Sequence, residues 1–278
     1  MHNACLYTAG VLADMAERTR RSGKGRTKLS SVANAILLLK AFSDERSELG
    51  ISALAERLHL AKSTVHRLAS TLVETGMLEQ GANGQYRLGL AVFELGSLVR
   101  RKLDLSFEAK PWLMTLREQT GETVDLSILD HDGVVCVNFL ESQKVNRISS
   151  GIGLRKPVHC TAEGKALIAF QPPQVIERLV STVHERRTPR TLTDAAALRE
   201  ELAKVRARGY AIDDEEYEVG VRSIAAPVRD DTGSSVAAVG VTGPAQRLTK
   251  SRLAIIGRHV DAAARAISLR LGARPKPR

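Results

Sequence analysis

Hydrogen-bonding side chains and one guanidinium group recur at helical spacing in a short segment of the chain. They are Ser63, His66, Arg67, Ser70 and Glu74. At about 100° per residue, these positions share one face of a helix. Arginine can donate two parallel hydrogen bonds to a guanine, and hydroxyl groups reach base edges or phosphates. With Lys62 and Thr64 beside it, this face is suited to the grooves of a nucleic acid.

The opposite face of the same segment is apolar, so the helix has a side to bury. Its members are Val65, Leu68, Ala69, Leu72 and Val73. A second helix is predicted from Ser52 to Leu58, with Ser52 as its N-cap, and residues 59–61 leave room only for a tight turn. A further helix is predicted earlier in the chain. Its apolar stripe consists of Val32, Ala35, Ile36, Leu39 and Phe42.

A β-hairpin is predicted after the polar helix. Gly76 is placed to end that helix, and residues 77–80 and 85–88 flank a turn with the pair Asn83-Gly84. Helix, short turn, helix and hairpin in this order are typical of a winged helix-turn-helix, which places its second helix in the major groove of DNA. Arg87 on the hairpin, or wing, is then placed to reach a phosphate or the minor groove. Two alternatives stay open: a winged-helix scaffold that binds no DNA, and His66 as an ordinary surface histidine.

Length and charge fit a DNA-binding unit joined to a larger one. The 278 residues exceed the size of one small domain and predict about two domains. Residues 1–102 hold 15 basic and 9 acidic residues, against 26 and 22 in the remainder. The formal net charge of +10 favours polyanions such as DNA or a membrane surface without selecting a site. We expect a disordered basic tail at 1–28, the winged helix-turn-helix domain at 29–89 and a linker helix at 90–103.

Several classes of protein are disfavoured by composition. No apolar run approaches the roughly twenty residues that span a bilayer, and no cleavable leader is visible, so we expect a cytoplasmic protein that does not enter a membrane. Cys5, Cys136 and Cys160 are too few and too widely spaced for a disulfide framework or a metal cluster. We expect no metal and no cofactor.

The residues from 104 to 273 have the pattern of a mixed α/β domain. Strands are predicted at 124–129, 134–139, 146–149, 224–228 and 236–242, and helices at 162–170, 174–180, 195–208 and 250–271. This order predicts an antiparallel sheet with helices and a core large enough for a small-molecule pocket. The linker helix before it carries more apolar surface than a lone helix exposes, so we expect a homodimer or a dimer of dimers. Its apolar residues are Leu90, Val92, Phe93, Leu95, Leu98 and Val99.

Three separated motifs carry a family resemblance. They are Leu60 to Leu68 with Tyr86 to Gly89, then His159 to Ala166, and finally Arg208 to Tyr210 with Asp213 to Glu216, Gly220 to Pro227 and Gly240 to Pro244. In this order they resemble the IclR family of bacterial transcriptional regulators. The resemblance implies an α+β chain: a winged helix-turn-helix domain joined by a helix to an effector-binding domain of GAF-like α/β fold, acting on a pseudo-palindromic operator in double-stranded DNA.

The same resemblance implies a set of residues around the effector. They are Val145, Ile148, Ala162, Glu163, Asp213, Ser223, Gly240 and Thr242. Many members have cysteine where this chain has Ser223, and some have polar side chains at Gly240, so a ligand cannot be transferred from a relative. The unpaired amides of the helix at Ala162, with Arg147, Arg155 and Lys156, suggest an organic acid as the effector.

An enzyme is the other reading of the His159 motif, because His159 and Cys160 could act as base and nucleophile. Neighbours along an extended segment point to opposite faces, which makes adjacent residues a poor catalytic pair. We therefore expect no catalytic residues and expect Cys160 to be a small buried side chain. The acidic run Asp213 to Glu216 leaves a solvated loop or a site for a neutral or cationic ligand as further alternatives.

Overall fold

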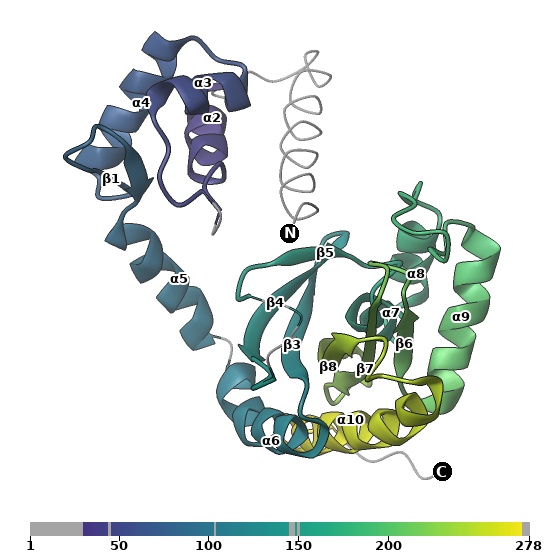
Figure 1. Ribbon diagram of the computed structural model, residues 1–278. Helices are drawn as coiled ribbons and strands as arrows, with labels where there is room; N and C mark the ends of the chain where they lie inside the picture. The colour runs from purple at the N-terminus through teal and green to yellow at the C-terminus, as the bar shows by residue number, and fades with distance from the viewer. Residues whose placement is uncertain (1–29, 44–45, 103, 145–147, 149–150, 274–278) are drawn as a thin grey trace. The chain divides into compact units, whose positions relative to one another are not determined.

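The structure is a computed structural model that describes residues 30–43, 46–102, 104–144, 148 and 151–273. The chain forms two compact units, one up to Lys102 and one from Leu103 onward (Figure 1). Each unit has an apolar core of its own. The tail predicted at residues 1–28 lies outside the described residues.

The first unit is a helical domain with a small hairpin. Its elements are α2 Ser30–Leu39, α3 Ile51–Leu58, α4 Lys62–Glu74, β1 Leu78–Gln80, β2 Tyr86–Leu88 and α5 Leu90–Lys102. Leu38, Leu54, Val65 and Ala69 are fully buried where α2, α3 and α4 meet. This arrangement confirms the winged helix-turn-helix, including the turn of three residues between α3 and α4.

Two details of the first two helices differ from the prediction. Helix α3 begins at Ile51 after Gly50, so Ser52 lies inside the helix and is not its cap. On α2 the fully buried residue is Leu38, whereas Val32 and Ile36 of the expected stripe are 55% and 48% exposed. Residues 35–39 are all apolar, and periodicity cannot choose the buried face of a helix that is apolar almost all round.

Glycines connect α4 to the wing and the wing to α5. Gly76 has a φ of +69° directly after α4, the left-handed conformation that ends a helix. Gly89, after β2, passes so close to this turn that an added Cβ would lie 2.1 Å from the Gly76 carbonyl oxygen. The backbones of Leu49 and Tyr86 also exchange two hydrogen bonds of 2.9 Å, which tie the segment before α3 to the wing.

The second unit is an antiparallel sheet between two layers of helices. Its elements are α6 Asp104–Thr120, β3 Thr123–Asp130, β4 Gly133–Leu140, β5 Arg155–Pro157, α7 Ala162–Ile168, α8 Pro173–Val180, α9 Ala195–Arg208, β6 Ala211–Asp214, β7 Val221–Arg229, β8 Ser235–Pro244 and α10 Lys250–Arg270. The sheet order is β5-β4-β3-β8-β7-β6. Helix and sheet bounds agree closely with the prediction, but the short strands β5 and β6 were not predicted. The strand predicted at 146–149 lies mostly outside the described residues, and Ile148 is not in a strand.

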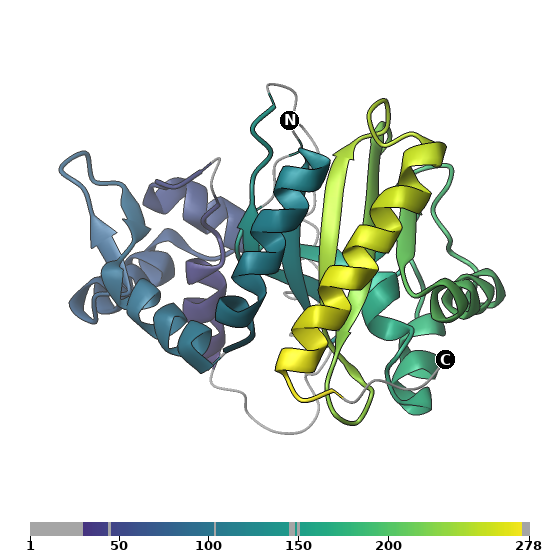
Figure 2. The same ribbon diagram turned by 90° about the horizontal axis from the view of Figure 1, so that it is seen from below.

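The two faces of the sheet are different chemically. Helices α6 and α10 lie side by side across one face (Figure 2), and the side chains packed there are apolar, among them Leu113, Leu126 and Val260. Helix α7 covers the other face and packs against α8 and α9. Side chains of a strand alternate between faces, so Thr123, Asp125 and Ser127 of β3 point away from the apolar α6 and α10 side. No helix in the described part of the chain is long and apolar enough to cross a membrane.

Candidate functional site

Helix α4 presents its predicted polar face to solvent. Lys62, Ser63, His66 and Arg67 are exposed, while Thr64 and Ser70 are half-buried. Val65 and Ala69, on the other side of the helix, are buried in the core. They hold the polar face outward, where it is accessible to a partner. Because a helix enters the major groove of DNA by such a face, the geometry is that of a recognition helix.

The wing arginine is already paired within the unit. Arg87 Nε and Nη2 donate to Glu79 Oε2 at 2.9 and 2.8 Å, across the β1–β2 pair. The hydrogen bond to Glu79 raises the pKa of Arg87 further, and both side chains are about half exposed. Arg87 can therefore contact a phosphate only by leaving or sharing Glu79, a competition that the sequence did not reveal.

In the second unit, four polar side chains form a row across the sheet. Thr123 on β3 pairs with Thr242 on β8, Thr242 pairs with Ser223 on β7, and Ser223 pairs with Asp213 on β6. All four are at least 94% buried, since their exposures are 1%, 6%, 3% and 3%. A row of this kind is unusual inside a core, because buried polar groups need hydrogen-bond partners. Three members, Asp213, Ser223 and Thr242, were predicted as effector-site residues.

The next row contains Asp125 on β3 opposite Gly240 on β8. Glu163, in the first turn of α7, reaches the same place: a Cβ added at Gly240 would lie 2.6 Å from Glu163 Oε1 and 2.7 Å from Asp125 Oδ1. Burial raises the pKa of Asp125 to about 8, and the charge of Glu163 adds to this rise. Thr161 caps α7 by accepting the Gly164 amide at 3.2 Å.

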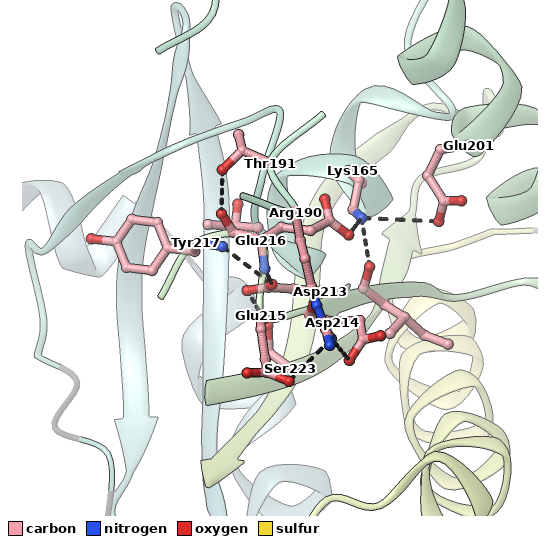
Figure 3. A network of polar contacts seen from close by, with 12 residues as sticks. Lys165, Arg190, Thr191, Glu201, Asp213, Asp214, Glu215, Glu216, Tyr217 and Ser223 are labelled. Carbon is pink, nitrogen blue, oxygen red and sulfur yellow. Dashed lines mark hydrogen bonds and ion pairs between the residues drawn. The ribbon is translucent and has the colours of Figure 1, made fainter. Parts of the chain in front are cut away.

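The acidic run at the end of β6 is an ordered turn rather than a solvated loop (Figure 3). Asp213 Oδ1 accepts the backbone amides of Glu216 and Tyr217 at 2.7 and 3.3 Å. Thr191 Oγ1 donates to the Glu216 carbonyl at 2.7 Å. Burial, followed by the charge of Glu216, raises the pKa of Asp213 to about 7. The turn therefore fixes Asp213 at the end of the polar row.

Lys165 anchors this turn to α7. Its side chain has no exposed surface, and its Nζ contacts Glu216 Oε1 and the Ile212 carbonyl, with Glu201 of α9 at 3.9 Å (Figure 3). A buried ammonium group is stable only with such partners. Lys165 thus joins α7, α9 and the acidic turn at one point, a role that its place in a helical sequence did not indicate.

The other two acids of the run face arginines. Arg190 Nη1 lies 3.1 Å from carboxylate oxygens of both Asp214 and Glu215 (Figure 3). Arg222 Nε donates to Asp214 Oδ1 at 2.5 Å. Glu215 has a φ of +63° and accepts the Gly220 amide at 3.0 Å. These pairs neutralise the outer half of the acidic run, so only Asp213 and Glu216 bring carboxyl groups to the interior.

The remaining predicted effector residues are placed less closely or lie outside the description. Ala162 begins α7, and the Ile148 carbonyl accepts a hydrogen bond of 3.2 Å from Thr123 Oγ1 at the end of the polar row. Val145 is not among the described residues. Sequence reasoning missed Asp125, because an acid that follows an apolar residue in an alternating strand is expected on the solvated face, whereas here α7 packs against that face and Asp125 is buried.

His159 and Cys160 are both buried in the interior of the second unit. The His159 ring stacks on His184 at 4.3 Å between ring centres, and its Nε2 lies 3.0 Å from the Glu185 carbonyl. Burial, together with His184, lowers the pKa of His159 to about 4. Cys160 is fully buried, as expected, and burial raises its thiol pKa. Among the described residues, no His, Cys, Asp and Glu side chains gather in a way that could hold a metal ion.

Comparison with known proteins agrees with both units. Residues 31–82 match the family described as the IclR helix-turn-helix domain, and residues 98–269 match the bacterial transcriptional regulator IclR C-terminal family. The chain is 39% identical to the HTH-type transcriptional regulator BhcR of Paracoccus denitrificans over 82% of each chain. It is 31% identical to the transcriptional repressor IclR of Escherichia coli, over 88% of this chain and 91% of that one.

Solved structures show the same likeness. An IclR homolog from Microbacterium hydrocarbonoxydans, complexed with 4-hydroxybenzoate, superposes with a TM-score of 0.76 at 29% identity, over 88% of this chain and all of the other. A helix-turn-helix unit followed by an α/β unit with a buried polar site defines a DNA-binding transcriptional regulator with an effector domain. The chain belongs to the IclR family of these bacterial regulators.

Proposed function

We propose that this regulator binds its operator with α4 in the major groove. We further propose that its binding to the operator changes when a small molecule binds the polar rows of the second unit. The observation that carries the first part is the exposed polar face of α4 over a fully buried apolar one. Lys62, Ser63, Thr64 and Arg67 contact base edges and phosphates, His66 and Ser70 lie at the margin of the contact, and Arg87 contacts the backbone from the wing.

The small-molecule site lies where the polar rows meet α7. Asp213, Ser223, Gly240 and Thr242 line one side and Glu163 the other, with Ala162 and Ile148 beside them; Val145, the remaining residue of the predicted set, lies outside the described residues. Two buried oxygen atoms here, Glu163 Oε1 and Thr242 Oγ1, have no hydrogen-bond partner among the described residues. Because an unpaired buried polar group costs free energy, the Glu163 oxygen favours a ligand that supplies a donor, and the Thr242 hydroxyl favours a ligand that donates to it or accepts from it.

The sequence suggested an organic acid as the effector, and the surroundings of the basic residues bear on that suggestion. Of the cations that suggested it, Arg155 bonds to the Asp130 carboxylate and carbonyl. Burial opposes the charge of Lys156, but Glu163 and Asp125 keep its pKa raised. Both cations therefore already have acidic neighbours, and the Arg147 side chain lies outside the described residues.

The functional unit is a homodimer, or a dimer of dimers. On α5, Leu90, Phe93, Leu95 and Leu98 are between 51% and 68% exposed, an apolar surface typical of an interface. Two copies would place two recognition helices on half-sites about one helical turn of DNA apart, or a multiple of it. Sedimentation equilibrium that finds only monomer at micromolar concentration would refute this part. Such a regulator acts in the cytoplasm, where bacterial DNA lies.

Coupling requires that the ligand binds one arrangement of the dimer more tightly than another. The alternative function, catalysis by Cys160, has little support because His159 is bonded elsewhere and the thiol is buried. A Cys160→Ala variant is therefore expected to retain DNA binding and its response to ligand.

The test of the proposed function is a gel shift with the purified protein on the DNA upstream of its own gene, with an excess of random competitor. We expect a shift that resists the competitor and changes with one class of small molecule. If no fragment is bound specifically, genome-wide selection of bound DNA decides between a distant operator and a scaffold that binds no DNA.

A further inference from the structure

Two carboxyl groups from different elements meet above one glycine. Asp125 is contributed by β3 and Glu163 by α7, and they are only 2% and 1% exposed. Their oxygens Oδ1 and Oε1 lie within 2.7 Å of the position that a Cβ of Gly240 would take. The two oxygens therefore occupy the space of a side chain at position 240, and they supply acceptors where a serine would supply a hydroxyl group.

The acceptors at this place outnumber the donors. Ser127 Oγ donates to Asp125 Oδ2 at 2.6 Å. A hydrogen bond between the two carboxyl groups is one cause of the raised pKa of Asp125, so the pair shares a proton. Apart from that shared proton, Glu163 Oε1 has no hydrogen-bond partner among the described residues, and neither has Thr242 Oγ1, two residues along β8 from Gly240 and on the same face. The Thr242 hydroxyl is an independent sign of an unfilled contact, since it belongs to neither carboxyl group.

The charges nearby do not remove this excess. Lys156 acts on both Asp125 and Glu163, so its ammonium group is shared between two carboxyl groups. Tyr217 lies under Lys156, whose Nζ is 6.0 Å from the ring centre. The other buried lysine, Lys165, is committed to Glu216 and the Ile212 carbonyl.

The far end of the polar row is different, because its acceptor is already saturated. Asp213 Oδ1 takes two backbone amides of the acidic turn, and Ser223 Oγ lies 3.4 Å from Asp213 Oδ2. Glu216 Oε2, in that turn, is also buried without a hydrogen-bond partner among the described residues, but Glu216 is paired with Lys165 through its other oxygen. Around Gly240, by contrast, two carboxyl groups share Lys156. We call Asp125, Glu163 and Thr242 the acceptor subsite.

We propose that the acceptor subsite binds the hydroxyl or ammonium end of a small polyol or amino alcohol, and that it disfavours a carboxylate there. This rests on the proposed small-molecule site. A hydroxyl or ammonium group donates hydrogen bonds to the carboxyl oxygens and to Thr242 Oγ1, whereas a carboxylate only accepts and would face the negative charge that the carboxyl pair retains. The identity of the side chains around Gly240 thus sets which end group of the effector is accepted.

The test compares matched probes on the full chain. Three-, four- and five-carbon polyols, each with its aldonate and its terminal amine, are screened by thermal shift and then titrated by calorimetry. The variants are Glu163→Gln and Asp125→Asn with Glu163→Gln, which keep shape and remove charge. Asp132→Asn makes the same change in the exposed turn of the β3–β4 hairpin and is the matched control.

We expect a polyol or an amine to raise the melting temperature of the wild type and of D132N more than its aldonate does. In the double variant, the ratio of the polyol or amine affinity to the aldonate affinity is expected to fall at least tenfold. The aldonate itself is expected to bind the double variant more tightly than it binds the wild type. If the double variant does not fold, E163Q alone is expected to show the same change in smaller measure. Calorimetry in two buffers of different ionisation enthalpy separates the sources, because an ammonium ligand displaces protons from the pair and a polyol does not.

An aldonate that binds the wild type more tightly than its polyol and amine would overturn the proposal, and so would a panel in which no member shifts the wild type. Failure of the proposed function has a different signature. In that case a polyol or amine binds with the expected dependence on Glu163, but the gel shift on operator DNA is unchanged by it.

Discussion

The polar face of α4 and the polar rows of the second unit use the same kinds of side chain in opposite ways. On α4, Arg67 and Lys62 are exposed to water and are available to a partner. In the second unit Lys165 is fully buried and its contacts are made within the chain. The charges on the α4 face stay solvated until a partner binds. In the buried polar rows, by contrast, the charges are already paired within the chain, and only selected atoms are left without a partner.

The largest effect is expected when a buried charge of the second unit is removed. Lys165→Met leaves Glu216 buried without its cation, and such changes cost about 3 to 5 kcal/mol of unfolding free energy. Urea unfolding followed by the fluorescence of Trp112, the single tryptophan of the chain, reports on the second unit. Lys204→Met removes the exposed pair with Glu200 and is the control, for which no change of midpoint is expected. Equal midpoints for the two variants would contradict the assignment of Lys165 as an anchor.

Arg67→Ala tests the exposed polar face of α4 and should weaken binding to operator DNA by about 1 to 3 kcal/mol. The fold should be unaffected because the side chain is exposed. Fluorescence anisotropy on operator and random DNA measures the two affinities, with the exposed Arg46→Ala as a control in the same unit. An equal loss on both DNAs would reduce Arg67 to a phosphate contact.

The pH dependence of stability should report on the buried acids of the second unit. The pKa of Asp125 is raised to about 8 and that of Asp213 to about 7, chiefly by burial. A raised acid holds its proton in the folded state, so its contribution is complete below the pKa of the unfolded chain and is lost as pH rises through the folded value. Melting temperatures should therefore fall from about pH 5 to about pH 8.

Glu163→Gln should flatten this fall, because the charge of Glu163 is the second cause of the raised Asp125 pKa. Melting curves of wild type and variant across the same pH range provide the measurement. A wild-type melting temperature that is constant or rises over this range would exclude the two buried acids as the dominant titrating groups.

The smallest effect is expected at the wing. Glu79→Gln weakens the hold on Arg87 and should tighten binding to DNA a few-fold, with a steeper dependence on salt. Titrations at several salt concentrations measure the slope. Arg87→Ala in the same background should cancel the gain, and a gain that persists would show that Glu79 acts by repelling phosphate directly.

The sequence predicted the helices and hairpin of the first unit well, because local signals decide them. Gly76 marks the end of α4, Asn83 and Gly84 mark the wing turn, and the Val65 stripe marks the buried face. The α2 stripe was less successful, since Val32 and Leu38 are equally apolar and only tertiary packing distinguishes them. Strands β5 and β6, of 3 and 4 residues, are too short for an alternating pattern to be visible.

The buried polar rows could be predicted from the sequence only in part, for a physical reason. Asp213, Ser223 and Thr242 come from the family motifs, and the sheet register does place them in one row. Asp125 and Lys165 are separated from that row in sequence and reach it through strand pairing and helix packing. Periodicity describes one element at a time, so it cannot show which elements bring their polar positions together.

The polar row also bears on how such a regulator can change its ligand during evolution. Thr123, Thr242, Ser223 and Asp213 each stand on a different strand, and the strands are joined by backbone hydrogen bonds that do not depend on the side chains. A substitution at one of these positions alters one point of the site and leaves the sheet register in place. The polar row can therefore change one contact at a time, so that gene duplicates could diverge in their preference for small molecules in single mutational steps while the DNA-binding unit stays the same.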